Sequence, residues 1–253
     1  MVNPNDARPP FRQVADPLRD DIESGRLAPG ERMPSISELV ERFGVTNGTV
    51  QRAMTYLRTL GLIETRHGSG SIVTPNRPWI AVTSAAWTSA AGTPLTFWAG
   101  QAAAHGFTGT QELLGVDVEV PPAEVRAALG LAGDETAVAR KRLMRLDDEA
   151  VQLVTSYFPH SVADGTPLAE PQKIKGGAAA VLAESPRPPV EALEMVSSGM
   201  PTQDEAKALR LRPGVPVIRL LRSTIDADGL PVEGMVMVLS AHRHRLMYRW
   251  RIG

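Results

Sequence analysis

Residues 35–61 carry two apolar stripes at helical spacing, and this pair restricts the fold more than any other feature of the sequence. Ser35 followed by Glu38 is the pattern of a capping box, in which each side chain satisfies an unpaired amide of the first helical turn. Gly44 is typical of a helix end. The apolar positions between these signals share one helix face: Ile36, Leu39, Val40 and Phe43.

A second helix is expected directly afterwards. Thr46 or Asn47 can cap its start, and Gly61 follows its last apolar position. Its predicted buried stripe consists of Val50, Ala53, Met54, Leu57 and Leu60. Two helices separated by so short a turn predict a helix-turn-helix, the geometry that places the second helix in the major groove of DNA.

The composition permits this interpretation. The chain has 253 residues, enough for two domains with separate cores, and its 43% hydrophobic and 22% charged content is ordinary for a globular protein. The absence of cysteine excludes disulfide scaffolds, thiolate metal sites and cysteine nucleophiles. No leading signal-peptide pattern and no 18-residue apolar run is present, so we expect a cytoplasmic protein that does not bind membranes.

The charge distribution is compatible with DNA binding, although the net charge of −1 disfavours it slightly. Residues 42–66 contain one acidic residue, Glu64, and four arginines: Arg42, Arg52, Arg58 and Arg66. The acidic side chains before them are expected on a helix that faces away from DNA: Asp16, Asp20, Asp21 and Glu23. Such segregation allows phosphate contacts of modest affinity.

The region around the two helices adds more local signals. Apolar residues at helical spacing predict another amphipathic helix near the start of the chain: Phe11, Val14, Leu18 and Ile22. The segment "GRLAPGERMPS" is a connector rich in proline and glycine, and "RHGSG" lies within a glycine-punctuated hairpin. In order, spacing and turn chemistry, residues 9–73 resemble the winged-helix domain of the GntR family of bacterial transcription regulators. We therefore expect a winged helix-turn-helix domain over residues 1–75.

The resemblance also implies which residues contact DNA. The family usually has arginine where this chain has Ser37, Asn47 and Gln51, which suggests a different operator or weaker binding. Asn and Gln can read an adenine edge, and Ser and Thr can bind phosphates. The expected contact residues are Ser35, Ser37, Thr46, Asn47, Gly48, Thr49, Gln51 and Arg52, with Arg66, His67 and Gly68 at the wing tip. The alternatives are a helix-turn-helix that only packs, and a His67 that is an ordinary surface residue.

The pattern changes after Pro75. "TPNRPW" has the composition of a linker, which we place at residues 76–93, before a second domain at 94–253. Nearby aromatic residues are interpreted as core anchors: Trp87, Phe97 and Trp98. The second domain contains a near repeat, because residues 116–158 match residues 194–240. The matched pairs are Leu129 and Leu209, Leu131 and Leu211, Arg142 and Arg222, and Val151 and Val232.

Each repeat predicts a strand, a short helix opened by proline or threonine, and a hairpin that turns at "LDDEA" or "IDADGLP". Two such units should pair their strands into one antiparallel sheet, which makes the fold class α+β. Residues 80–250 resemble the effector-binding UTRA domain of the HutC subgroup of GntR regulators, which has a chorismate-lyase-like fold. The resemblance is best in "RLMRLDDEAVQLVTSYFP".

The UTRA resemblance implies a pocket for a polar effector beside Arg142. The chain departs from the family at Val154, which stands where the family has a glutamate, in "KGGA", which lacks a Ser-x-Tyr, and at His242, which replaces an aspartate. The expected pocket residues are Arg142, Gln152, Val154, Ser156, Tyr157 and Glu233. Arg142 as a surface charge and Tyr157 as a core aromatic are the alternatives. Because Val154 removes a carboxylate, we expect an effector with an apolar body and an anionic or strongly polar head.

Together these features predict a homodimeric repressor that binds a short palindrome on double-stranded DNA and is released by a small-molecule effector. An enzyme with the chorismate-lyase-like fold is one alternative, although we find no Ser-His-Asp set, paired carboxylates, metal cluster or phosphate loop, and we expect no cofactor. "HRHR" at 242–245 is interpreted as a solvated strand end. An effector-independent DNA-binding protein is the other alternative, which the duplicated second domain disfavours.

Overall fold

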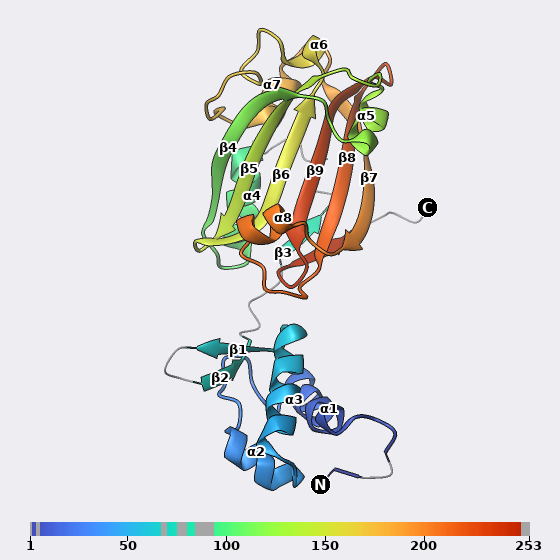
Figure 1. Ribbon diagram of the computed structural model, residues 1–253. Helices are drawn as coiled ribbons and strands as arrows, with labels where there is room; N and C mark the ends of the chain where they lie inside the picture. The colour runs from blue at the N-terminus through green and yellow to red at the C-terminus, as the bar shows by residue number, and fades with distance from the viewer. Residues whose placement is uncertain (1, 4–5, 67–69, 75–79, 84–93, 249–253) are drawn as a thin grey trace, which may run out of the picture. The chain divides into compact units, whose positions relative to one another are not determined.

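The computed structural model describes residues 2–3, 6–66, 70–74, 80–83 and 94–248. It divides into two compact units (Figure 1), with residues 1–77 forming the bulk of the first and residues 78–211 and 216–253 the second. None of the helices within the described ranges combines the length and apolar character needed to cross a membrane.

The first unit is a three-helix domain with a small sheet. Its elements are α1 (Pro10–Glu23), α2 (Ile36–Phe43), α3 (Asn47–Thr59), β1 (Ile63–Arg66) and β2 (Gly70–Val73). β1 and β2 pair antiparallel, with Ile63 opposite Val73. The order of three helices followed by a hairpin is that of a winged helix-turn-helix, as the sequence predicts. His67 and Gly68 lie outside the described residues, and only the backbone of Arg66 is described.

Local hydrogen bonds define the ends of α2 and α3. The Ser35 hydroxyl accepts a bond from the Glu38 amide at 3.2 Å, and the Glu38 carboxylate accepts one from the Ser35 amide at 2.7 Å. Gly44 ends α2 with φ 66°, a conformation that a side chain would strain. Thr46, and not Asn47, caps α3, because its hydroxyl accepts a 3.4 Å bond from the Thr49 amide. The predicted capping box is therefore confirmed.

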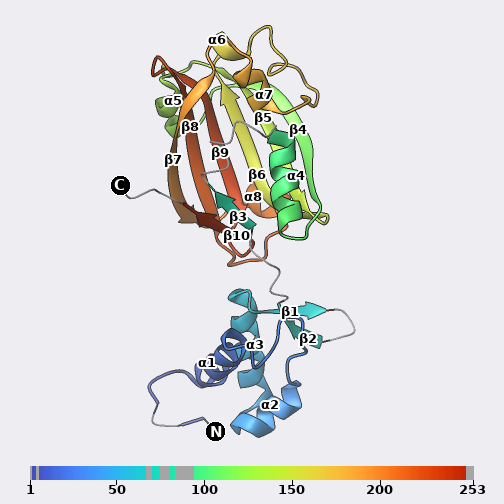
Figure 2. The same cartoon turned by 180° about the vertical axis from the view of Figure 1, so that it is seen from behind.

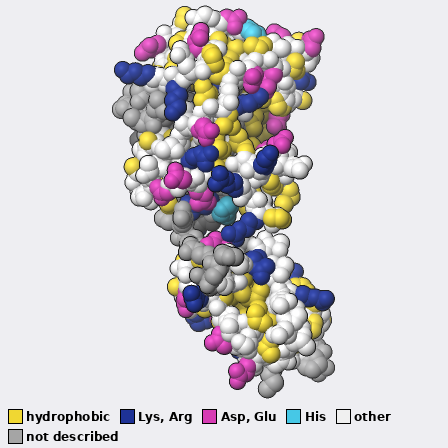
Figure 3. Space-filling view, turned by 60° about the vertical axis from the view of Figure 1, so that its left-hand side comes forward, with side chains coloured by type: hydrophobic (Ala, Val, Ile, Leu, Met, Phe, Trp, Pro, Cys, Tyr) yellow, Lys and Arg dark blue, Asp and Glu magenta, His cyan; other side chains and the backbone are white. Residues whose placement is uncertain are grey.

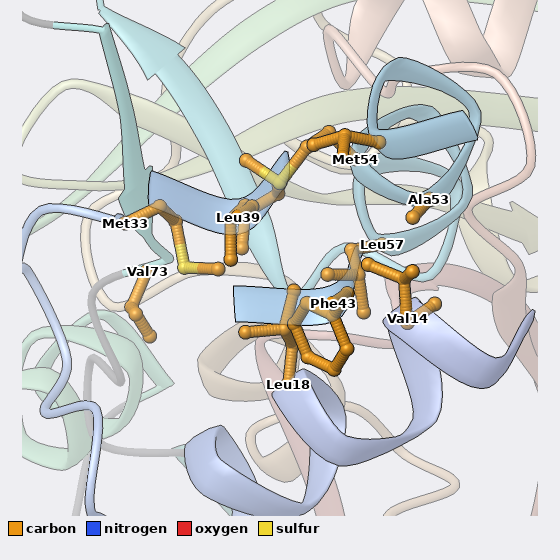
Figure 4. Packing of buried hydrophobic residues seen from close by; sticks show 12 residues of the cluster. Val14, Leu18, Met33, Leu39, Phe43, Ala53, Met54, Leu57 and Val73 are labelled. Carbon is orange, nitrogen blue, oxygen red and sulfur yellow. The ribbon is translucent and has the colours of Figure 1, made fainter. Parts of the chain in front are cut away.

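One apolar core joins the three helices and the hairpin of this unit (Figure 4). Its buried residues are Val14, Ala15, Leu18, Met33, Leu39, Phe43, Val50, Ala53, Met54, Leu57, Ile63 and Val73. Burial of this surface stabilises the unit, since each fully buried large aliphatic side chain contributes about 1.5–3 kcal/mol. Leu60 departs from the expected stripe: it is 44% exposed, because it follows the last turn of α3 and serves as the C-cap.

The second unit is an α+β domain built on one sheet. Its strands are β3 (Ile80–Thr83), β4 (Gly109–Glu119), β5 (Ala137–Leu146), β6 (Glu149–Phe158), β7 (Pro189–Gly199), β8 (Val217–Asp226), β9 (Pro231–Ser240) and β10 (His244–Met247). Its helices are α4 (Pro94–Ala104), α5 (Ala123–Leu129), α6 (His160–Ala163), α7 (Ala178–Ala183) and α8 (Gln203–Ala208). Six strands pair antiparallel in the order β4-β5-β6-β9-β8-β7.

The predicted repeat is visible in this order. The succession β4-α5-β5-β6 matches β7-α8-β8-β9, and β6 and β9 meet at the centre of the sheet. Both hairpins carry a register shift at the same place, between Met144 and Arg145 in the first and between Thr224 and Ile225 in the second. The helices begin as expected, α5 after Pro122 and α8 at Thr202.

Helices cover the two faces of the sheet unequally. α5 and α8 lie on one face (Figure 1), while α4 and the β3–β10 pair lie on the other (Figure 2). The side chain of Trp98 in α4 is buried, and its indole N–H donates to the backbone oxygens of Thr110 and Arg145 at 3.1 and 3.2 Å. Trp98 is thus a core anchor; Trp87 and the side chain of Phe97 lie outside the described residues.

The segment predicted as a linker, residues 76–93, contains strand β3. β3 pairs in parallel with β10, so that Ile80 stands opposite His244. This contact depends on residues more than 160 positions apart, which local composition cannot reveal. "HRHR" also differs from a solvated strand end: Arg243 and His244 are buried, and burial lowers the pKa of His244 to about 4.

Candidate DNA interface and effector pocket

The predicted DNA-contact residues of the first unit lie around the N-terminal turns of α2 and α3. All eight that the structure describes with side chains are exposed except Thr49, which is half-buried. A helix N-terminus presents unpaired amides and a partial positive charge, both of which favour a phosphate. The structure therefore presents helix N-termini and exposed polar side chains close together on this unit, and both kinds of group suit a phosphate backbone.

The hydroxyls and the longer side chains have different roles within that surface. Ser35 lies 3.0 Å from the Ser37 hydroxyl, in addition to its capping bond. Three longer side chains have no hydrogen-bond or ion-pair partner among the described residues: Asn47, Gln51 and Arg52. The hydroxyls therefore fix the helix ends, while these three exposed side chains are unbonded among the described residues.

The acidic and basic side chains of the first unit are less fully segregated than the sequence suggests. Asp21 on α1 accepts a 3.2 Å bond from Arg42 on α2, so an acidic residue expected to face away neutralises one of the four arginines. Arg58 is half-buried with its Nε enclosed. Arg52 is thus the exposed cation of α3 among the described residues of that helix.

The second unit contains a small pocket on the sheet face that α7 covers. Its volume, open mouth included, is about 290 Å³. It is lined by Gln111, Leu113, Arg140, Arg142, Lys173, Ile174, Gly177 and Ala178. Three of these residues are cationic and none is acidic, so the pocket is suited to an anionic group.

Arg142 is the predicted pocket residue that the structure places there. It stands in β5 between Leu113 of β4 and Val154 of β6, so neither neighbouring strand offers it a carboxylate in register. Its Nη2 donates to the Ser156 hydroxyl at 2.5 Å, and its buried Nε has no partner. Burial lowers the pKa of Arg142, against the opposing effect of the Glu233 charge, yet a guanidinium stays protonated.

Glu233 lies on the central strand β9 and is 1% exposed. Burial raises the pKa of this carboxyl, while a hydrogen bond from Ser156 and the charges of Arg142 and Arg222 act in the opposite direction. Its Oε1 has no hydrogen-bond partner. Glu233 is therefore a buried acid beneath the pocket and does not line it.

Arg140 holds one wall of the pocket in place. Its Nη1 donates to the backbone oxygens of Leu168 at 2.9 Å and Glu170 at 2.7 Å, and its Nη2 donates to that of Gln172 at 2.7 Å. These bonds fix the loop that leads to Lys173. Arg140 is thus a positioning residue whose donors are largely occupied, whereas Arg142 retains an unused donor.

The remaining predicted pocket residues divide between the two faces of the sheet. On β6, the side chains of Gln152, Val154 and Ser156 lie on the same face of the sheet as Arg142, because Val154 stands opposite Arg142 and every second residue of a strand shares a face. All three are buried. Tyr157 lies on the opposite face of the sheet, where it packs with Val125 and Leu129 of α5, and its hydroxyl donates to Glu119 at 3.2 Å. The structure therefore does not bring Tyr157 to the pocket.

Sequence reasoning identified only Arg142 among the pocket-lining residues and missed Gln111, Leu113, Arg140, Lys173, Ile174, Gly177 and Ala178. Leu113 lies just before the segment recognised as the first repeat, and extending the alignment by three residues would have included it. Lys173 belongs to a loop with no counterpart in the second repeat. Across the described residues there is no group of three or more His, Asp or Glu side chains arranged to hold a metal ion.

The comparisons with known proteins agree with this architecture. Residues 10–73 match the family of bacterial regulatory proteins named gntR, and residues 104–245 match the UTRA domain. The chain belongs to the UTRA-containing GntR regulators, the HutC architecture. Its helix-turn-helix is accordingly a DNA-binding domain and its UTRA domain an effector-binding domain. Members of this family are transcription regulators and not enzymes, so the enzyme alternative is set aside.

Individual relatives support the same assignment. An HTH-type transcriptional regulator of Streptomyces coelicolor is 28% identical over 253 residues, covering 96% of this chain and 93% of the relative. The HTH-type transcriptional repressor NagR of Bacillus subtilis is 22% identical over 247 residues, covering 98% and 97%. The repressor MngR of Escherichia coli, of a mannosyl-D-glycerate transport/metabolism system, is 39% identical over 70 residues, or 28% and 29% of the two chains.

Solved structures share the fold. A crystal structure of a GntR-family transcriptional regulator has a TM-score of 0.69 at 26% identity, covering 97% of this chain and 99% of the other. PhnF from Mycobacterium smegmatis has a TM-score of 0.60 at 19% identity, covering 95% and 100%. The second likeness concerns the fold alone.

Proposed function

We propose that this regulator is a cytoplasmic repressor that binds a short palindromic operator as a homodimer and releases it when a small molecule binds the UTRA pocket. The observation that carries the proposal is the pairing of two surfaces in one chain. The first unit exposes Asn47, Gln51 and Arg52 around a helix N-terminus, and the second contains a pocket with three cations and no acid. Release of the operator then requires only that the effector bind more tightly to the conformation of the dimer that does not fit the operator.

The DNA-binding part of the proposal is tested by selecting duplexes from random sequence with the full chain. Gln51→Ala should cost about 1–3 kcal/mol on the selected site and relax preference at one base pair, because a bidentate base contact is lost. Asn47→Ala tests the same kind of contact.

Arg52→Ala should instead weaken binding to all sequences and reduce the log–log salt slope by about one per half-site, as expected for a phosphate contact. Arg19→Ala on α1 is the matched control and should leave binding unchanged. If selection enriches no sequence above background, specific repression is excluded.

The homodimer part of the proposal is supported by the unequal edges of the sheet. β4 carries a bulge between Leu113 and Gly115, and it bears three acidic residues, Glu112, Asp117 and Glu119, two features that discourage edge pairing. Figure 3 turns the β4 side forward and shows acidic and basic side chains interspersed over the second unit. β4 also exposes Leu114 by 48% and Val118 by 61%, so its protection against pairing comes from the bulge and the acidic residues and not from a lack of apolar surface.

β7 is the contrasting edge. Like β4 it is 11 residues long without lysine or arginine, but it bears two acidic residues instead of three, and its register shift, between Pro189 and Glu191, lies at its very start. It exposes Leu193 by 63% and Met195 by 60%, with Val190 and Val196 also exposed. An extended apolar edge of this kind pairs readily with another strand. We place the partner copy here, with its own β7 antiparallel to this one, because a two-fold axis presents the same strand from both subunits.

Sedimentation should give about twice the 27.2 kDa chain mass. Met195→Lys should shift the protein toward monomer and weaken operator binding, whereas Val118→Lys on the β4 edge should do neither. A monomer that persists with operator DNA present would exclude the homodimer. A dimer unaffected by Met195→Lys would place the interface elsewhere.

Effector dependence separates this proposal from an effector-independent DNA-binding protein. A fluorescent operator fragment bound to the full chain should be released by at least one small anion in a metabolite screen. The same ligand should bind more weakly to the DNA complex than to the free protein, by the same factor, since coupling is reciprocal. Operator binding that no compound alters would favour the effector-independent alternative.

A further inference from the structure

The internal repeat gives Arg142 a counterpart, Arg222, and the two arginines have different partners. Arg142 stands in register with Leu113 on the edge strand β4. Arg222 stands in register with Glu194 on the edge strand β7. The edge positions 113 and 194 are thus equivalent, and an apolar side chain in one repeat takes the place of a carboxylate in the other.

The partner in the second repeat is a close one. Glu194 accepts a 2.7 Å bond from the Arg222 Nε and a second bond from the Arg222 Nη2. Arg222 is 3% exposed, so this pair is buried. Both donors bond to the same oxygen, Oε1 of Glu194, so one carboxylate oxygen occupies the Nε–Nη2 edge of the guanidinium in a charge-assisted contact.

The first repeat has the same donors without the acceptor. The Arg142 Nε is buried and unpartnered, whereas its Nη2 bonds to Ser156. Leu113 and Arg142 both line the pocket, so the residue that replaces the carboxylate and the arginine with the unused donor belong to one site. A buried unsatisfied donor on a charged group is costly, and a bound anion would relieve that cost.

We propose that the effector carries a carboxylate, and that this group binds Arg142 in the place that the Glu194 carboxylate takes beside Arg222. The proposal rests on the proposed function of the pocket and names its ligand class. Leu113 then contacts the apolar part of the effector next to its head group, and Lys173 and Gln111 lie at the same pocket wall. The second repeat is a site closed by its own side chain, and the first is the same site left open for a ligand.

The placement can be tested without DNA or a known effector, by giving the first repeat its own carboxylate. The variants are Leu113→Glu and its neutral control Leu113→Gln, each also combined with Arg142→Met. Unfolding of the full chain is followed by tryptophan fluorescence, because Trp98 is buried in the second unit and the sequence has no tryptophan within residues 1–77.

At pH 7, Leu113→Glu should have a folded-to-unfolded ratio about tenfold higher than Leu113→Gln, as close charge pairs can contribute this much. The advantage should vanish in the Arg142→Met background and below the pKa of the introduced carboxyl. If the two variants are equally stable, or if the difference persists with Arg142→Met, the proposed placement is wrong. Neither result depends on operator release, so failure of the proposed function would be recognised separately.

The ligand class is tested with a set of aliphatic and aromatic carboxylates, each paired with its primary amide. At least one carboxylate should raise the unfolding midpoint of the wild-type chain, its amide should not, and Leu113→Glu should weaken that carboxylate at least tenfold. Amides that bind as well as their acids, a set with no carboxylate ligand, or carboxylates that bind Leu113→Glu unchanged would each overturn the assignment.

Discussion

The two repeats of the effector domain share a backbone plan and differ in what surrounds one arginine. In residues 189–240, Arg222 is buried and closed off by Glu194, which accepts bonds from its Nε and Nη2. In residues 109–158, Arg142 faces Leu113 and Val154 and borders a pocket. The comparison teaches that the proposed binding site is an interior contact with one member left out. Duplication supplies both versions, and substitution of an edge-strand residue distinguishes them.

The largest effect is expected from opening the closed repeat. Glu194→Ala leaves Arg222 buried without its carboxylate and should destabilise the second unit by about 3–5 kcal/mol. The matched change in the open repeat, Leu113→Ala, removes only half-buried apolar surface and should cost about 1 kcal/mol. Chemical denaturation followed by tryptophan fluorescence measures both. Equal losses would mean that the two arginines are not in contrasting states.

A second prediction uses the matched pair Glu233 and Gln152, the equivalent positions of β9 and β6. Burial raises the pKa of Glu233 above its ordinary 4.5. Its contribution to stability is therefore complete below pH 4.5 and is lost as the pH rises through the folded-state pKa. Each unit of difference between the folded and unfolded pKa corresponds to about 1.4 kcal/mol.

Glu233→Gln should therefore flatten the decline in unfolding free energy between acid and neutral pH, and Gln152→Glu should steepen it. Denaturant midpoints measured across this pH range give the slopes directly. If Glu233→Gln leaves the slope of unfolding free energy against pH unchanged, the Glu233 carboxyl stays ionised in the folded protein. Glu233 would then resemble Glu194, whose carboxylate is paired with an arginine.

The smallest effect concerns the hairpin turns. Asp147 and Asp148 have φ of 43° and 69°, whereas the second repeat has Gly229 at φ 77°. Asp148→Gly should stabilise the first hairpin by about 0.5 kcal/mol, because Asp-Gly suits a turn with two positive φ angles. Gly229→Ala should have the opposite effect, by about 1 kcal/mol. Thermal midpoints of the two variants that move in the same direction would contradict this account of the turns.

The sequence predicts features that depend on local chemistry. The Ser35–Glu38 capping box, the Gly44 helix end and the order of elements in both repeats involve neighbouring residues, and all are found in the structure. The single antiparallel sheet also follows, because each repeat leaves a half-buried hairpin that must find a partner.

The position of Tyr157 could not be predicted because it depends on a bulge. A two-residue turn at Asp147–Asp148 without irregularity would place Arg142 opposite Leu153, and Tyr157 would then share its face. The register shift after Met144 adds one residue to β6 and places Val154 there instead, which turns Tyr157 to the other side. Hydrophobic alternation alone does not locate such a shift. The β3–β10 pairing and the position of Lys173 are likewise non-local.

The parallel pairing of β3 and β10 has a consequence for the architecture of such regulators. Within the described part of the effector domain, the first strand begins at Ile80 and the last ends at Met247, and these two strands lie side by side. The two ends are therefore separated by roughly one four-residue strand, about 13 Å. A domain whose ends are so close can be inserted into the surface loop of a host protein without separating the flanking chain. This fold could thus be transplanted as a ligand-responsive insert, independent of any DNA-binding partner.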